Sequence, residues 1–159
     1  MRRALSISPL AAALAFAALS ATAEPAAAHC QVPCGIYDDH ARVHAMLEDV
    51  TTITKAMDQI TRLAGKTDAQ SLNQVTRWIA TKEHHASNII SVVSEYFLTQ
   101  KIKAADPKDA AAWQAYLDKL VAHHRVMRLA MKAKQTVDTK VAAELAEAVH
   151  ALERLWPTK

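Results

Sequence analysis

Residues 43–63 read VHAMLEDVTTITKAMDQITRL, and apolar side chains recur in this segment every three or four positions. This spacing predicts a long amphipathic helix, because side chains three and four positions apart lie on the same face of an α-helix. The helix is expected to begin near Asp38 or Asp39, whose carboxylates suit a helix N-terminus, and to end at Gly65.

Three more helices are expected downstream of this one. The second should begin near Ser71, with these apolar residues on one face: Leu72, Val75, Ile79, Ala86, Ile90, Val93 and Phe97. The third should begin at Asp106-Pro107, since proline suits the first position of a helix, and should carry Trp113, Tyr116, Leu117, Leu120, Val121 and Met127. The pattern breaks at residues 135–138, and a fourth helix, closed by Pro157, should carry Val141, Leu145, Val149, Leu152 and Trp156.

The composition agrees with a single all-α domain. The chain has 159 residues, of which 51% are hydrophobic and 22% charged. Its two glycines cannot form a G-x-G-x-x-G fingerprint or a P-loop, and a formal charge of +3 is too small for a nucleic-acid binder without a basic stripe. Four helices with short connections predict an antiparallel up-down four-helix bundle.

The first 28 residues have the pattern of a secretory signal peptide. Met1 to Arg3 is basic, and the apolar run from Leu10 to Leu19 is too short to be a permanent membrane anchor. Cleavage sites with small residues precede both Glu24 and His29. We therefore expect an exported protein, periplasmic or extracellular, with no membrane anchor after cleavage. Cleavage at the second site would make His29 the first residue.

The motif HCQVPCG at residues 29–35 contains both cysteines of the chain, Cys30 and Cys34. One interpretation is a disulfide, since exported proteins meet oxidising conditions, although the loop it would close is very small. The other is a metal site. A free amine on His29, the next backbone nitrogen and two thiolates make a planar set of two nitrogens and two sulfurs, which favours Ni(II) or Cu(II).

At this motif the sequence resembles the nickel superoxide dismutase family. The matching residues are His29-Cys30-x-x-Pro33-Cys34-Gly35-x-Tyr37-Asp38, and Ser94-Glu95-Tyr96-Phe97 and Leu155-Trp156-Pro157-Thr158 are similar to further family segments. The resemblance implies a signal peptide over 1–28, a nickel-binding hook over 29–37 and a four-helix bundle over 38–159. It also implies a homohexamer.

The resemblance further implies an enzyme that converts superoxide to dioxygen and hydrogen peroxide by Ni(III)/Ni(II) cycling. One nickel ion per subunit would be held by the amine and imidazole of His29, the backbone nitrogen of Cys30, and the thiolates of Cys30 and Cys34. Tyr37 and Tyr96 are then expected beside the metal as catalytic residues. The alternatives are an exported nickel or copper carrier without turnover, and a helical module whose cysteines form a disulfide.

The sequence departs from the family at the residues expected to hold the imidazole of the first histidine. Family members have a glutamate and an arginine there, whereas this chain has His44 or Ala45 at the first position and Thr81 or Lys82 at the second. Candidate replacements along the chain are Arg77, Lys82 and Glu83. Most histidines of the 84–85 and 123–124 pairs are expected to be surface groups, and Glu147 with His150 is one half of a di-iron motif that has no second half.

Overall fold

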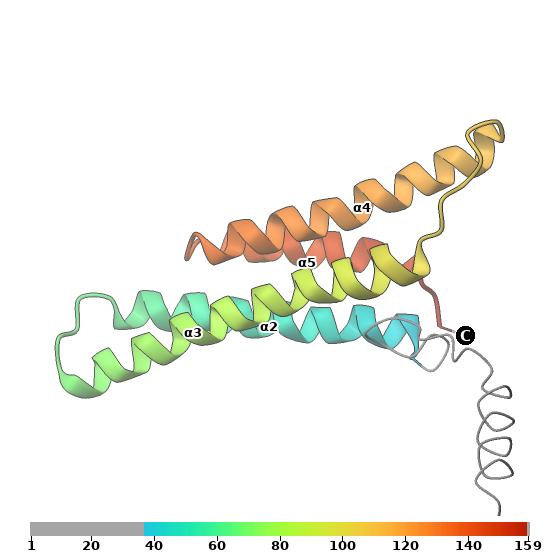
Figure 1. Cartoon of the computed structure of the whole chain (residues 1–159). Helices are drawn as coiled ribbons and strands as arrows, with labels where there is room; N and C mark the ends of the chain where they lie inside the picture. The colour runs from blue at the N-terminus through green and yellow to red at the C-terminus, as the bar shows by residue number, and fades with distance from the viewer. Residues whose placement is uncertain (1–36, 159) are drawn as a thin grey trace, which may run out of the picture.

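The structure is a computed structural model that describes residues 37–158. Over this range the regular secondary structure is all helical, as predicted (Figure 1). The helices are α2 (Asp39–Leu63), α3 (Ala69–Ser91) with its direct continuation η1 (Val92–Lys101), α4 (Ala110–Lys134) and α5 (Thr139–Glu153). None of the helices in the described range is long and apolar enough to span a membrane.

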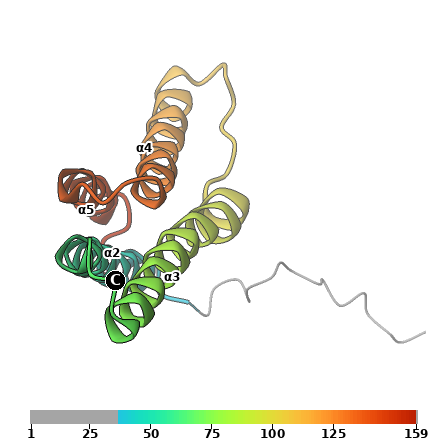
Figure 2. The same cartoon turned by 90° about the vertical axis from the view of Figure 1, so that its left-hand side faces the viewer.

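The helices form a four-helix bundle in which each helix packs against two others, α3 and its continuation η1 being counted as one helix. Helix α2 packs against α3 and α5, and α4 packs against the same two helices from the other side. Figure 2 views this arrangement from the end, and Figure 1 shows that successive helices run in opposite directions. The predicted antiparallel bundle is therefore confirmed. It places the start of α2, the end of η1 and the last described residues at the same end of the molecule.

Each α-helix begins with an aspartate that caps its first turn. Asp38 caps α2, and its carboxylate accepts hydrogen bonds from the backbone N–H groups of residues 40 and 41. After α2 ends, Gly65 has a φ of +80°, a left-handed conformation that glycine adopts without strain. Helix α3 begins two residues before the predicted Ser71 because Asp68 caps it. The predicted first helix is confirmed at both ends to within two residues.

The predicted start of the third helix is wrong by three residues. Asp106 and Pro107 form a turn in which the Asp109 N–H donates to the Asp106 carbonyl oxygen at 3.0 Å. The helix itself begins at Ala110, because the Asp109 carboxylate accepts from the N–H of Ala112 at 3.0 Å. Both Asp106 and Asp109 are suitable residue types for capping a helix. Asp109 caps α4 because its carboxylate reaches a backbone N–H three residues ahead.

The core follows the predicted apolar pattern in α2 and α5 but not throughout α3 and α4. Leu72, Ile79 and Val121 were expected in the core and are 50%, 45% and 68% exposed. The first turns of α3, to which Leu72 belongs, extend with the end of α2 beyond α4 and α5 (Figure 1), so α4 and α5 do not cover them. On α4 the buried face consists of His123, Val126, Ala130 and Ala133.

The segment η1 is a π-helix, in which hydrogen bonds reach back five residues instead of four. The N–H of Ile102 donates to the Phe97 carbonyl oxygen at 2.9 Å, and the Thr99 hydroxyl donates to the Ser94 carbonyl oxygen at 2.6 Å. Within this segment two consecutive aromatic residues, Tyr96 and Phe97, are both buried. Short π-helical segments occur frequently at functional sites.

A buried histidine anchors the end of the chain. The imidazole of His123 donates from Nδ1 to the Lys119 carbonyl oxygen at 2.7 Å and accepts at Nε2 from the Trp156 indole N–H at 3.1 Å. The Trp156 carbonyl oxygen in turn lies 3.1 Å from Nδ1 of His40 in the first turn of α2. Burial lowers the pKa of His123, which favours the neutral ring that both hydrogen bonds require. The expectation of a surface histidine was therefore wrong here, although His84 and His124 are exposed.

Candidate functional site

The two predicted site tyrosines come together although they are far apart in the sequence. Tyr37 is the first described residue, two positions before the start of α2, and Tyr96 lies in η1. Their ring centres are 6.4 Å apart and meet edge to face at 85°. The predicted metal ligands His29, Cys30 and Cys34 lie outside the described residues.

The hydroxyl of Tyr96 is held by a carboxylate from the first turn of α2. It donates to Oδ1 of Asp39 at 2.5 Å and also lies 3.3 Å from the Tyr37 carbonyl oxygen. The other oxygen of Asp39 forms an ion pair with Nζ of Lys101 at 3.0 Å. Burial, followed by the hydrogen bond and negative charge of Asp39, raises the pKa of Tyr96 far above its ordinary value. Tyr96 is therefore a neutral phenol throughout the physiological range.

Sequence reasoning did not find the partners of Tyr96. Asp39 was recognised only as a helix-start residue, since an acid in the first turn has that ordinary interpretation. The sequence did not identify Lys101 as a site residue, because Lys101 lies at the end of the π-helix η1 and meets Asp39 only in the folded structure.

Next to the tyrosines lies a cleft of about 150 Å³ between α2 and the end of α3. Its lining residues come from both helices and from η1: Arg42, Asn88, Ser91, Val92, Glu95 and Tyr96. The guanidinium carbon of Arg42 lies 4.2 Å from the centre of the Tyr37 ring, a stacked arrangement that fixes the orientation of the cation. Arg42 was not predicted as a site residue, because a single arginine on an amphipathic helix is usually a surface group.

Further along the α2–α3 contact, a buried carboxylate joins the two helices. Asp49 accepts from Nδ1 of His85 at 2.6 Å and from the amide of Asn88 at 2.7 Å. His85 was expected at the surface, but this pairing leaves it half-buried. Both hydrogen bonds join members of this cluster, which is the usual arrangement for a buried polar group that holds two helices in register.

The proposed replacements for the family's glutamate and arginine do not meet at the tyrosines. His44 points toward α5, where its Nε2 lies 3.4 Å from Oε1 of Glu153. Lys82 is buried and donates to the carbonyl oxygens of Ala133 and Lys134, so it closes the C-terminal end of α4. Glu83 accepts from Lys82 at 2.9 Å and belongs to the same contact. These two residues lie at the opposite end of the bundle from Tyr96.

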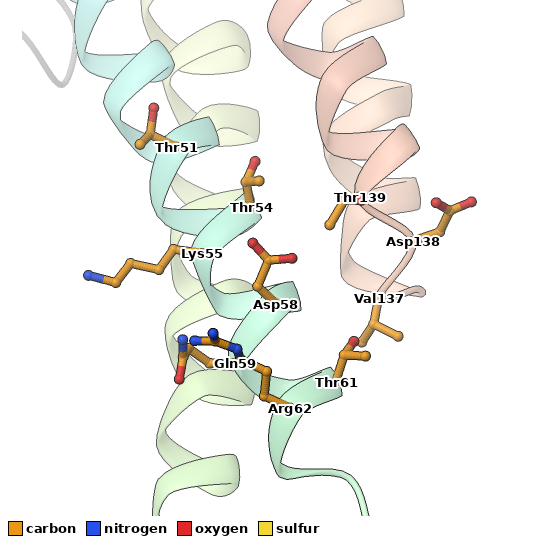
Figure 3. Close-up of a pocket in the computed structure, with 10 residues that line it drawn as sticks. All are labelled: Thr51, Thr54, Lys55, Asp58, Gln59, Thr61, Arg62, Val137, Asp138 and Thr139. Atoms are coloured by element: carbon orange, nitrogen blue, oxygen red, sulfur yellow. The ribbon is translucent and has the colours of Figure 1, made fainter.

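A wider groove of about 800 Å³ lies between α2 and the α4–α5 connection (Figure 3). Two cations and two carboxylates contribute to its lining: Lys55, Arg62, Asp58 and Asp138. It is at the far end of the bundle from the tyrosine pair. Among residues 37–158, no group of three or more His, Cys, Asp or Glu side chains is arranged to hold a metal ion.

Replacing Asp39 with Asn is expected to bring the pKa of Tyr96 down toward its ordinary value near 10. The amide oxygen can still accept the hydroxyl proton, but the negative charge that opposes ionisation is gone. The measurement is tyrosinate absorbance during an alkaline titration, with a Tyr96→Phe variant to assign the transition. The matched control is Asp38→Asn, which changes a neighbouring carboxylate that makes no hydrogen bond to Tyr96. An unchanged titration in Asp39→Asn would show that this carboxylate does not control the phenol.

The fold and site thus define a small helical bundle with a pair of tyrosines held beside the start of its first helix. The chain belongs to the nickel-containing superoxide dismutase family, whose family model matches residues 24–159. It is accordingly a nickel-dependent superoxide dismutase, an oxidoreductase, and the family resemblance seen in the sequence is confirmed. No curated protein and no solved structure matches the chain.

Proposed function

We propose that the mature enzyme begins at His29 and holds one nickel ion per chain in the segment 29–34. The ligands would be the amine and imidazole of His29, the backbone nitrogen of Cys30, and the thiolates of Cys30 and Cys34. This donor set suits nickel, because thiolate and deprotonated amide donors favour a planar site and stabilise the higher oxidation state.

The observation that carries this proposal is the tyrosine pair. Three peptide units separate Cys34 from Tyr37, so the Cα atoms of these residues are at most about 11 Å apart. A metal held by Cys34 would therefore lie near the end of the bundle where Tyr37 meets Tyr96 at 6.4 Å between ring centres.

Nickel, when bound, supplies one-electron exchange between Ni(III) and Ni(II), which allows one superoxide to be oxidised to dioxygen and another to be reduced to hydrogen peroxide. The second half of this reaction consumes two protons. Residues of the bundle would hold protons close to the place where superoxide is reduced to hydrogen peroxide. The Tyr96 hydroxyl keeps its proton because the phenol is buried and donates a hydrogen bond to Oδ1 of Asp39 at 2.5 Å. Nζ of the partly exposed Lys101 pairs with the other oxygen of Asp39.

Tyr37 and Tyr96 would also order water and restrict the approach to small molecules. The two rings meet edge to face at the site, and the guanidinium carbon of Arg42 lies over the Tyr37 ring, 4.2 Å from its centre. An arrangement of this kind admits a diatomic anion more readily than a large ligand. We assign Tyr37 and Tyr96 the roles of orienting water and superoxide.

We further propose that residues 1–28 are a signal peptide, that the enzyme acts outside the cytoplasm, and that it assembles as a homohexamer. The basic start and the apolar run before residue 20 support export. The exposed apolar side chains Leu72, Ile79 and Val121 offer surface for contacts between subunits.

The deciding experiment determines the first residue of the exported protein by mass spectrometry, together with its nickel content and its superoxide consumption. We expect His29 as the first residue, one nickel per chain, and catalysed consumption. A chain beginning at Glu24 would contradict the proposal, because the His29 nitrogen would then lie in a peptide bond. A matched variant that keeps Ala28 before His29 should lose nickel. Full nickel content without superoxide consumption would instead indicate a carrier.

A further inference from the structure

The guanidinium of Arg42 has a hydrogen-bond donor that no group of residues 37–158 satisfies. Its Nε is buried and has no hydrogen-bond partner among residues 37–158, and it is the only buried side-chain nitrogen or oxygen in that range of which this is true. A buried donor without an acceptor is costly, and in native proteins it commonly has a bound ion or water as its partner.

The positive charge of Arg42 is also unbalanced within the described part of the chain. Lys101, at the same end of the bundle, pairs with Asp39 at 3.0 Å, whereas no ion pair joins Arg42 to a carboxylate of residues 37–158. The stacking on Tyr37 keeps the guanidinium in one place rather than letting it extend into solvent. Its charge reaches the neighbouring phenol, since Arg42 opposes the rise in the pKa of Tyr96.

The cleft that Arg42 lines has the size and chemistry for a small anion. A volume of about 150 Å³ holds a few heavy atoms, given that one water occupies about 30 Å³ of the liquid. Ser91 contributes a hydroxyl to the lining, and Asn88 contributes an amide that gives only one of its two hydrogens to Asp49. Glu95 is the one carboxylate of the lining; its side chain is exposed, so solvent screens its repulsion.

We propose that this cleft is a binding site for small monovalent anions, with Arg42 as the residue that binds them. Superoxide belongs to this class, and an anion in the cleft would lie beside Tyr96, which lines the same space. The assignment of superoxide as the natural occupant rests on the proposed function, whereas the anion site itself does not. Arg42 would then capture the substrate next to the tyrosine pair and select for negative charge.

The test uses chloride as the probe and measures the line width of its chlorine-35 resonance with the complete nickel-loaded protein. Bound chloride relaxes quickly, so the native protein should broaden the signal. Arg42→Gln should weaken chloride binding by about tenfold or more, because a charge-assisted contact is lost. Arg42→Lys should weaken it less, since the charge remains but Nε and the planar fork do not. The matched control is Arg128→Gln, which changes an exposed arginine of α4 and should leave chloride binding as in the native protein. Glu95→Gln removes the carboxylate of the lining and should tighten chloride binding by about twofold.

Two results would overturn the proposal. One is equal chloride broadening by Arg42→Gln and Arg128→Gln. The other is unchanged chloride binding in Arg42→Gln combined with loss of nickel, which would show that Arg42 binds the segment 29–36 instead. Superoxide kinetics separate this proposal from the proposed function. With both correct, Arg42→Gln lowers kcat/KM and flattens its dependence on salt. Chloride binding that depends on Arg42 in a protein without nickel or turnover would contradict the proposed function and leave the anion site in place.

Discussion

Cys34→Ser is expected to remove nickel and superoxide consumption together. A serine hydroxyl does not ionise near neutral pH, so it cannot replace a thiolate as a soft anionic ligand. We expect the nickel content to fall from the proposed one per chain to near zero, and superoxide decay to slow to the uncatalysed rate. The measurement is metal analysis by mass spectrometry combined with a superoxide decay assay on the same sample.

Two controls make the Cys34 result specific. The helices of the bundle lie within residues 39–153, so the circular dichroism of Cys34→Ser should match that of the native protein. Gln31→Ala changes a residue of the same segment that is not proposed as a ligand, and it should keep nickel and turnover. Turnover that survived in Cys34→Ser would refute the proposed ligand set.

His123→Ala is expected to lower the free energy of unfolding by about 2–4 kcal/mol. The substitution leaves a cavity beside Phe97, whose ring centre lies 5.1 Å from that of His123, and it leaves the Trp156 indole N–H without its acceptor. Chemical denaturation measures this change. The matched control is His124→Ala at the adjacent exposed position, where a change within about 0.5 kcal/mol is expected. Equal effects at the two positions would mean that the buried contacts of His123 contribute little.

The same histidine makes stability depend on pH. Burial lowers the pKa of His123 in the folded protein, so the unfolded chain takes up a proton more readily once the pH falls below about 6.5. The free energy of unfolding should therefore decrease as the pH falls below this value, by at most about 1.4 kcal/mol for each pH unit from this one group. His123→Ala should lack this component, and His124→Ala should retain it. Denaturation midpoints between pH 5 and 7.5 would show the difference.

The helices of the bundle could be predicted from the sequence wherever a single residue type, or one face of regularly spaced apolar residues, determines the local structure. The apolar spacing of α2 and α5 identified their buried faces because neighbouring helices cover these two helices over most of their length. The same rule failed at Leu72 and Val121, since periodicity identifies an apolar face without saying whether another helix lies against it. The start of α4 was missed because Asp106 and Asp109 both satisfy the capping rule, and local geometry decides between them.

The tyrosine pair was predictable only through the family resemblance, and its surroundings were not predictable at all. Nothing in the composition of residues 92–101 distinguishes a π-helix from an α-helix, yet this π-helix contains the tyrosine that donates to Asp39. Arg42 was missed for a related reason. Its importance comes from a buried Nε and a stacked ring, and these are properties of packing rather than of sequence spacing.

The anchoring of Trp156 also bears on the order in which the molecule assembles. The contact between Trp156 and His40 joins residues 116 positions apart, whereas a connection of only a few residues joins α2 to α3. Closing a long loop costs more entropy than closing a short one, so the α2–α3 hairpin should form early and the contact with Trp156 late. A partly folded chain in which only the α2–α3 hairpin has formed lacks this last contact. The tyrosine end of the bundle should therefore be completed only after Trp156 has packed against the first turn of α2.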